Sequence, residues 1–166
     1  SFLARLGSGS AARSVEGPLV LWGEHAATPV SSDLFGVRWT KAADVFTTYR
    51  DTILLVDKGQ KEVSSTVGHN LMHNHPFAET RFAQAKAHYQ ALLTILEKGD
   101  MDGFSDLVER EALSLHAMML TSSPSYILMH PNTIQIIQEV RTFRKTSGLH
   151  LTFTLDAGAN VHLLYP

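Results

Sequence analysis

Three consecutive segments of helical character fill most of the second half of this 166-residue chain and restrict its fold more than any other feature. They span residues 78–97, 102–119 and 131–145. Each repeats apolar residues at the spacing of one helix face. Gly99 directly follows the first segment, Pro131 stands near the start of the third, and Gly148 lies just past its end. Proline at a helix start and glycine after a helix end are the expected boundary signals, so we predict three separate helices.

Four apolar runs of strand length flank these helices, at residues 19–22, 52–56, 149–155 and 161–165. The run at 52–56 is rich in β-branched and apolar residues, which predicts a buried strand. Strands grouped before and after a block of helices are typical of an α+β fold. A change of composition near residues 69–76 further predicts a first domain of residues 1–68 and a second, helix-rich domain of residues 69–166.

Composition excludes several classes of protein. The net charge is −2 and no run of lysine and arginine is long enough to form a basic arm, so we expect no nucleic-acid partner. No apolar stretch reaches the length of a membrane span. The chain holds 0 cysteines, which excludes disulfides and thiolate chemistry and is compatible with a cytoplasmic location. Because it opens at Ser1 and stops directly after a strand-like run, we expect a piece of a longer protein.

A loop rich in glycine and serine lies near the start, at residues 7–14, and runs into small helix-forming residues. Its glycines and hydroxyls, followed by a helix start, are suited to hold an anion such as phosphate. Arg13, one turn later, could reach a second oxyanion with its planar guanidinium. The plain alternative is a helix cap. No lysine follows the glycines, which excludes a Walker loop, and a dinucleotide fingerprint would need a strand before Gly7.

The histidines suggest a competing metal site. His69 and His73 stand four residues apart, as on one face of a helix, and His75 is close by. No acidic residue completes the zinc pattern His-Glu-x-x-His, and Pro76 would interrupt the helix. We therefore expect no metal held by the protein alone. His116 is predicted to be part of a packed helix surface rather than a catalytic base.

Four segments carry a family resemblance through their order and spacing. They are RLGSGSAARS (5–14), VSSTVG (63–68), SLHA with SSP (114–117 and 122–124) and FTLDAGAN (153–160). Together they resemble the diphosphomevalonate decarboxylases, ATP-dependent decarboxylases of the superfamily that includes galactokinase, homoserine kinase and mevalonate kinase. The chain looks like the central and C-terminal portion of a family member. The resemblance implies the end of a ribosomal-protein-S5-like domain followed by a ferredoxin-like α/β sandwich, a two-layer α+β fold.

The same resemblance implies an activity. It is the conversion of mevalonate 5-diphosphate and ATP to isopentenyl diphosphate, ADP, phosphate and carbon dioxide in isoprenoid biosynthesis. Magnesium is expected to arrive with ATP rather than in a protein cage. The resemblance implies a small-molecule substrate and a cytoplasmic enzyme without a membrane partner, and it is compatible with a homodimer.

Site residues follow from the matching motifs. Asp156 is implied as the carboxylate that orients the substrate hydroxyl, accepts its proton and stabilises developing positive charge. Arg13 would grip the substrate carboxylate, and Ser10 would complete the catalytic set. The residues implied to contact substrate or ATP phosphates are Ser8, Gly9, Ser10, Ala11, Ala12, Arg13 and Thr66.

The chain departs from the family pattern at three positions. Ala12 stands where the family usually has cysteine, Pro18 where it has glycine and Ala159 where it has proline. None of these changes removes a group that we expect to be catalytic. Two other functions stay open: a small-molecule kinase of the same superfamily, and a folded fragment that is inactive because its N-terminal substrate site is absent. Without the resemblance, Asp156 would be read as an ordinary turn-forming aspartate.

Overall fold

A computed structural model describes residues 2–7, 11–15, 17–59 and 71–166. Its three long helices confirm the prediction: α4 (Ala78–Lys98), α5 (Met101–Leu120) and α6 (Pro131–Ser147). Gly99 and Gly148 end α4 and α6 with φ angles of 72° and 69°, a left-handed conformation that glycine adopts without steric cost. The local end signals in the sequence therefore set the helix lengths.

The strands nearest the helices form one antiparallel sheet of order β3-β5-β4. They are β3 (Arg50–Leu54), β4 (Thr152–Leu155) and β5 (Val161–Tyr165). In this register Val161 of β5 stands opposite both Leu54 and Leu155. The observed α+β arrangement confirms the predicted class, and β5 has the predicted bounds.

The prediction that residues 52–56 form a buried strand is wrong. Ile53 is 51% exposed and Leu55 61% exposed. The reason is that successive side chains of β3 alternate between the two faces of the sheet, and α5 and α6 cover only one of these faces. Leu54 and Val56 pack against the core, whereas Ile53 and Leu55 lie on the other face.

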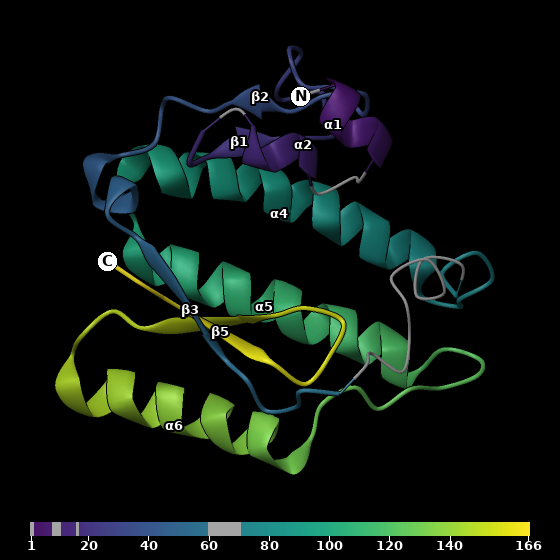
Figure 1. Cartoon of the computed structure of the whole chain (residues 1–166), viewed down its shortest axis with the longest axis vertical. Helices are drawn as coiled ribbons and strands as arrows, with labels where there is room; N and C mark the ends of the chain where they lie inside the picture. Colours follow the sequence, from purple (N-terminus) through teal and green to yellow (C-terminus); the bar gives the residue numbers. More distant parts are fainter. Residues whose placement is uncertain (1, 8–10, 16, 60–70) are drawn as a thin grey trace.

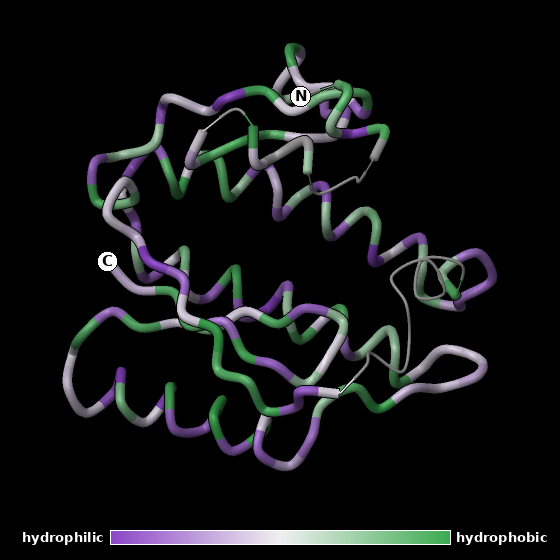
Figure 2. Tube along the Cα trace, viewed as in Figure 1, coloured by the Kyte–Doolittle hydropathy of each residue, from purple (hydrophilic) through white to green (hydrophobic). Residues whose placement is uncertain are grey.

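The main core lies between the sheet and two helices, α5 and α6 (Figure 1). Its buried members are all apolar: Ala112, Ile137, Val140, Phe153, Leu155 and Val161. Phe153 and Val161 are 0% exposed, so the strand ends that flank the β4–β5 loop are anchored in the interior. Along α4, α5 and α6, hydrophobic and hydrophilic residues alternate, as expected for helices with one buried side (Figure 2).

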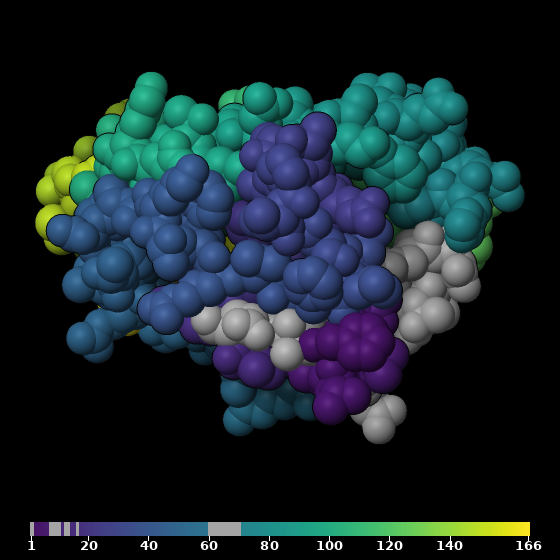
Figure 3. Space-filling model, turned by 90° about the horizontal axis from the view of Figure 1, so that it is seen from above, coloured from purple at the N-terminus to yellow at the C-terminus, as the bar shows by residue number. Residues whose placement is uncertain are grey.

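The N-terminal elements cover α4, where Figure 3 shows them in purple and blue. They are α1 (Phe2–Gly7), α2 (Ala11–Ser14), β1 (Val20–Leu21), β2 (Val37–Arg38) and the 3₁₀ helix η1 (Asp44–Thr47). β1 and β2 pair antiparallel. A hydrogen bond of 2.9 Å between the hydroxyls of Thr28 and Tyr89 ties this layer to α4.

α1 decides one question about the glycine-rich loop. A dinucleotide fingerprint requires a strand immediately before its glycines. Residues Phe2–Gly7 are helical instead, so that interpretation is excluded. The short helix predicted to follow the loop is confirmed as α2.

Candidate active site at the β4–β5 loop

The loop at residues 156–160 places an exposed carboxylate on a rigid base. Leu155, directly before the loop, is 5% exposed, and Val161, directly after it, is 0% exposed. Asp156 is the exposed first residue of the loop. An acidic side chain is thereby presented to solvent from a backbone whose two ends are fixed in the core.

Three elements hold the backbone of this loop. His116 of α5 donates a hydrogen bond from Nε2 to the carbonyl oxygen of Asp156, at 3.0 Å. Thr133 of α6 donates from its hydroxyl to the carbonyl oxygen of Ala159, at 2.6 Å. Asn160 accepts with its side-chain oxygen from the backbone amides that follow β3, those of Val56 at 2.9 Å and Asp57 at 3.0 Å. The loop is thus fixed at both ends and along its length.

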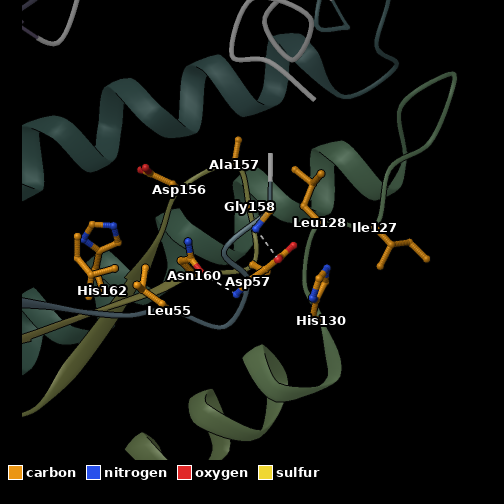
Figure 4. A pocket seen from close by; sticks show the side chains of 13 residues that line it. Leu55, Asp57, Ile127, Leu128, His130, Asp156, Ala157, Gly158, Asn160 and His162 are labelled. Atoms are coloured by element: carbon orange, nitrogen blue, oxygen red, sulfur yellow. Dashed lines mark hydrogen bonds between the residues drawn. The ribbon is translucent and has the colours of Figure 1, made fainter. Parts of the chain in front are cut away.

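A hollow of about 280 Å³ lies beside the loop. Four ionisable side chains line it, those of Asp57, His130, Asp156 and His162, among apolar neighbours such as Leu128. In Figure 4 the Asp156 carboxylate extends away from Asp57, on the side of the loop where His162 lies. The hollow is therefore lined by two carboxylates, those of Asp57 and Asp156, which point in different directions.

The two carboxylates and the histidines differ in their partners. Asp57 accepts a hydrogen bond from the amide of Gly59 at 2.8 Å, which is a local turn contact. His162 shares Nδ1 between both oxygens of Asp51, at 3.0 and 2.9 Å, on the open face of the sheet. Asp156 differs from Asp57 in that its main-chain carbonyl accepts a hydrogen bond from a buried side chain, that of His116 in α5.

The predicted phosphate-binding residues fall mostly outside what the structure describes. Ser8, Gly9, Ser10 and Thr66 lie outside the described residues. Ala11 is the first residue of α2 and is partly buried, and Ala12 and Arg13 follow in the same helix. The expected meeting of Arg13 with Asp156 at one substrate stays a prediction.

His75, a member of the competing histidine cluster, has a structural role. It is 7% exposed. Its Nε2 contacts the carbonyl oxygen of Met118 at 3.1 Å and the hydroxyl of Thr121 at 3.0 Å, and its Nδ1 accepts from the amide of Phe77 at 3.1 Å. Both ring nitrogens are used within the protein. His69 lies outside the described residues, and among those described no group of three or more His, Asp and Glu side chains is placed to hold a metal.

His116 was predicted to be packed against its surroundings, and the packing is confirmed because the side chain is 1% exposed. Burial lowers its pKa below the ordinary value of 6.5, and the hydrogen bond to Asp156 offsets that effect only in part. A sequence signal was present. His116 lies on the helix face of Ala112 and Met119, which are 3% and 2% exposed.

Two of the four motif segments meet in space at this point. SLHA supplies His116 from the C-terminal part of α5, and FTLDAGAN supplies Asp156 from the β4–β5 loop. The companion motif SSP holds the turn after α5, where the hydroxyl of Ser122 donates to the carbonyl oxygens of Met119 at 2.8 Å and Pro124 at 2.7 Å. These two motifs therefore build and support one loop.

Comparison with known proteins identifies a consistent set of relatives. Residues 52–166 match the family model described as the mevalonate 5-diphosphate decarboxylase C-terminal domain. The diphosphomevalonate decarboxylase of Candida albicans is 28% identical over 99% of this chain and 45% of its own length. The chain thus spans less than half the length of this relative.

Solved structures give the same result. The mevalonate diphosphate decarboxylase of Legionella pneumophila superposes with a TM-score of 0.78 at 29% identity, over 99% of this chain and 48% of its own. A structure described as MDDEF in complex with MVAPP, AMPPCP and magnesium gives a TM-score of 0.84 at 26% identity, over 99% of this chain and 49% of its own.

Proposed function

The chain belongs to the mevalonate 5-diphosphate decarboxylase family, and on that premise we propose that its protein is an ATP-dependent decarboxylase of mevalonate 5-diphosphate. The products are isopentenyl diphosphate, ADP, phosphate and carbon dioxide. The observation that carries the proposal is Asp156, an exposed carboxylate beside a hollow, on a loop whose backbone is fixed by buried side chains. The relatives from Candida albicans and Legionella pneumophila, both named as decarboxylases of mevalonate diphosphate, support the reaction class.

The chemistry needs a carboxylate at this position. A tertiary hydroxyl leaves readily only after it has been phosphorylated, so the terminal phosphoryl group of ATP first moves to the substrate oxygen. Asp156 orients the hydroxyl and accepts its proton during this transfer. The carbon–oxygen bond to phosphate then breaks, and positive charge develops on carbon beside the carboxylate. Loss of carbon dioxide supplies the electron pair for the new double bond.

Other groups complete the proposed site. Arg13 would hold the substrate carboxylate by two parallel hydrogen bonds until it leaves as carbon dioxide. Ser8, Ser10 and Thr66, with the backbone of the glycine-rich loop, would bind phosphoryl oxygens. Magnesium would reach the site on ATP, which needs few protein ligands. The relative described with AMPPCP and magnesium supports both ATP and the ion.

The finer points of organisation are also proposals. The expected fold is the end of a ribosomal-protein-S5-like domain followed by a ferredoxin-like sandwich, and the likeness to the Legionella structure supports its α+β character. The division at residues 68 and 69 falls in a segment outside the described residues, and β3 already shares a sheet with β4 and β5. No described helix is long and apolar enough to cross a membrane. The homodimer and the cytoplasmic location stay predictions.

The test is carbon dioxide release by the intact protein with ATP, magnesium and mevalonate 5-diphosphate, after its mass has been measured. Three Asp→Asn variants are compared, because this change keeps the shape of the side chain and removes its ability to accept the proton. Asp156→Asn should lower kcat by about 10²- to 10⁴-fold. Asp57→Asn tests the second carboxylate of the hollow. Asp102→Asn is the control for the substitution itself, because Asp102 lies on α5 outside the hollow and its side chain is 88% exposed.

The outcomes separate the alternatives. If Asp57→Asn abolishes the reaction and Asp156→Asn does not, the assignment of the base is wrong. ADP formation without carbon dioxide would indicate the kinase instead. A protein of 18.3 kDa that releases neither product would indicate the inactive fragment. Replacing the substrate with mevalonate 5-phosphate in a parallel assay measures how much of the recognition depends on the second phosphate.

A further inference from the structure

The carbonyl oxygen of Asp156 is hydrogen-bonded to His116, a buried histidine of α5. It accepts a hydrogen bond from His116 at 3.0 Å and a second from the amide of Gly158 at 2.8 Å. His116 lies on α5 and is 1% exposed. Because the carbonyl and the side chain of Asp156 share one Cα, this contact limits the directions in which the carboxylate can point.

The contact specifies the state of the histidine ring. A carbonyl oxygen only accepts hydrogen bonds, so Nε2 must carry the hydrogen. Nδ1 is buried and has no hydrogen-bond partner among the described residues. Protonating Nδ1 would bury a charged donor without an acceptor, which is costly. The ring is therefore a neutral donor whose single N–H is used on the Asp156 loop, and it has no free proton for acid–base catalysis.

A second buried donor secures the far end of the loop. Thr133, in the first turn of α6, is 0% exposed and donates to the carbonyl oxygen of Ala159 at 2.6 Å. The same hydroxyl accepts from the amide of His130 at 3.2 Å, which orients it. Both hydrogen-bonding roles of Thr133 are thus satisfied. α5 and α6 each hold one carbonyl of the loop, on either side of Gly158.

From this geometry we propose that His116 is a positioning residue, which sets the orientation of the Asp156 carboxylate through its backbone carbonyl, with Thr133 fixing the other end of the loop. This role rests on the proposed function of Asp156. Its importance follows from the precision that catalysis needs, since a displacement of about 1 Å remote from the chemistry can cost about 10²-fold in rate. Substrate binding depends mainly on other groups, so the effect should fall on kcat rather than on KM.

The experiment compares two substitutions of His116 in the intact protein. His116→Leu fills the site with an apolar side chain and removes the donor. His116→Gln retains an N–H at nearly the position of Nε2. We expect His116→Leu to lower kcat by about 10- to 100-fold with KM within about twofold, and His116→Gln to recover most of that loss.

His75→Leu and His75→Gln are the matched controls. His75 is a second buried histidine with a ring nitrogen on a main-chain carbonyl, that of Met118. It lies just before α4, against the C-terminal end of α5, and its hydrogen bonds go to Met118, Thr121 and Phe77 rather than to the β4–β5 loop. Its variants should lower stability and leave kcat within about threefold. If His116→Leu and His75→Leu change kcat alike, or if His116→Gln is no better than His116→Leu, His116 has only a structural role and the proposal is overturned.

A measurement independent of activity separates this proposal from the proposed function. The ¹⁵N NMR signals of His116 should show a protonated Nε2 and an unprotonated Nδ1, assigned by their loss in His116→Gln. The opposite tautomer would overturn the proposal even in an active enzyme. If Asp156→Asn keeps full activity, the proposed function fails and the positioning role fails with it, while the tautomer still reports whether the hydrogen bond exists.

Discussion

A buried ionic cluster on α5 should carry a large share of the stability of the C-terminal layers. Glu109 is 4% exposed and accepts hydrogen bonds from Arg144 at 2.6 Å, Arg141 at 3.2 Å and Thr152 at 3.0 Å. These partners come from α6 and β4, so one carboxylate joins three elements of the fold. The hydrogen bond that Arg144 donates to Glu109 raises the pKa of Arg144, which keeps that arginine charged.

The magnitude follows from what Glu109→Gln leaves behind. Removing one partner of a buried ion pair costs about 3–5 kcal/mol. Two features place this case near the lower limit. Arg144 keeps a hydrogen bond to the carbonyl oxygen of Leu151 at 2.7 Å, and the side chain of Arg141 is 50% exposed, so water compensates part of its lost contact. We therefore expect a loss of about 3 kcal/mol in the free energy of unfolding.

The assay is urea unfolding of the intact protein followed by circular dichroism, with midpoints compared at equal slope. Glu97→Gln is the matched control. Its ion pair with Lys41 spans 3.9 Å between side chains 42% and 70% exposed, so the change should cost less than about 1 kcal/mol. Added salt should reduce the loss of unfolding free energy caused by Glu97→Gln more than the loss caused by Glu109→Gln, because salt screens exposed charges more than buried ones. Equal shifts for the two variants would refute the reasoning that burial of Glu109 determines its contribution.

Three further predictions concern other parts of the fold. Burial raises the pKa of Glu111, but hydrogen bonds from Arg81 and His88 lower it more, to below 4.5. The stability from Glu111 is therefore present above pH 4.5 and is lost as the pH falls through the lowered pKa, so Glu111→Gln should flatten the acid limb of a stability–pH curve. Gly148→Ala should cost about 1 kcal/mol in thermal unfolding, through its φ of 69° alone, because a Cβ there meets nothing within 4 Å. Phe153→Ala, at a residue 0% exposed, should cost about 3–5 kcal/mol in urea unfolding, and a smaller loss would mean that the core collapses around the cavity.

The parts of the fold that sequence predicts well are those with local causes. Gly99 and Gly148 ended two helices in a conformation that depends on the residue itself, and Pro131 began the third. The exposure of β3 had no local cause. Its apolar composition resembles that of a buried strand, and only the sheet order and the single helix-covered face determine that Ile53 and Leu55 lie outside the core.

The candidate site also has one part that the sequence predicts and one part that depends on the packing of distant elements. Asp156 could be found because its motif is continuous in the sequence, whereas its supports are not: His116 precedes it by 40 residues, and Thr133 precedes Ala159 by 26. No spacing rule connects these pairs, because the path between them depends on how α5 and α6 pack against the sheet. His116 nevertheless lies inside one of the family motifs, and the sequence predicted only that it packs. A polar residue on a buried helix face needs a hydrogen-bond partner, and here the partner is the main chain of the residue proposed to do the chemistry. A buried polar residue within a family motif therefore indicates that its hydrogen-bond partner, here the β4–β5 loop, needs a fixed position.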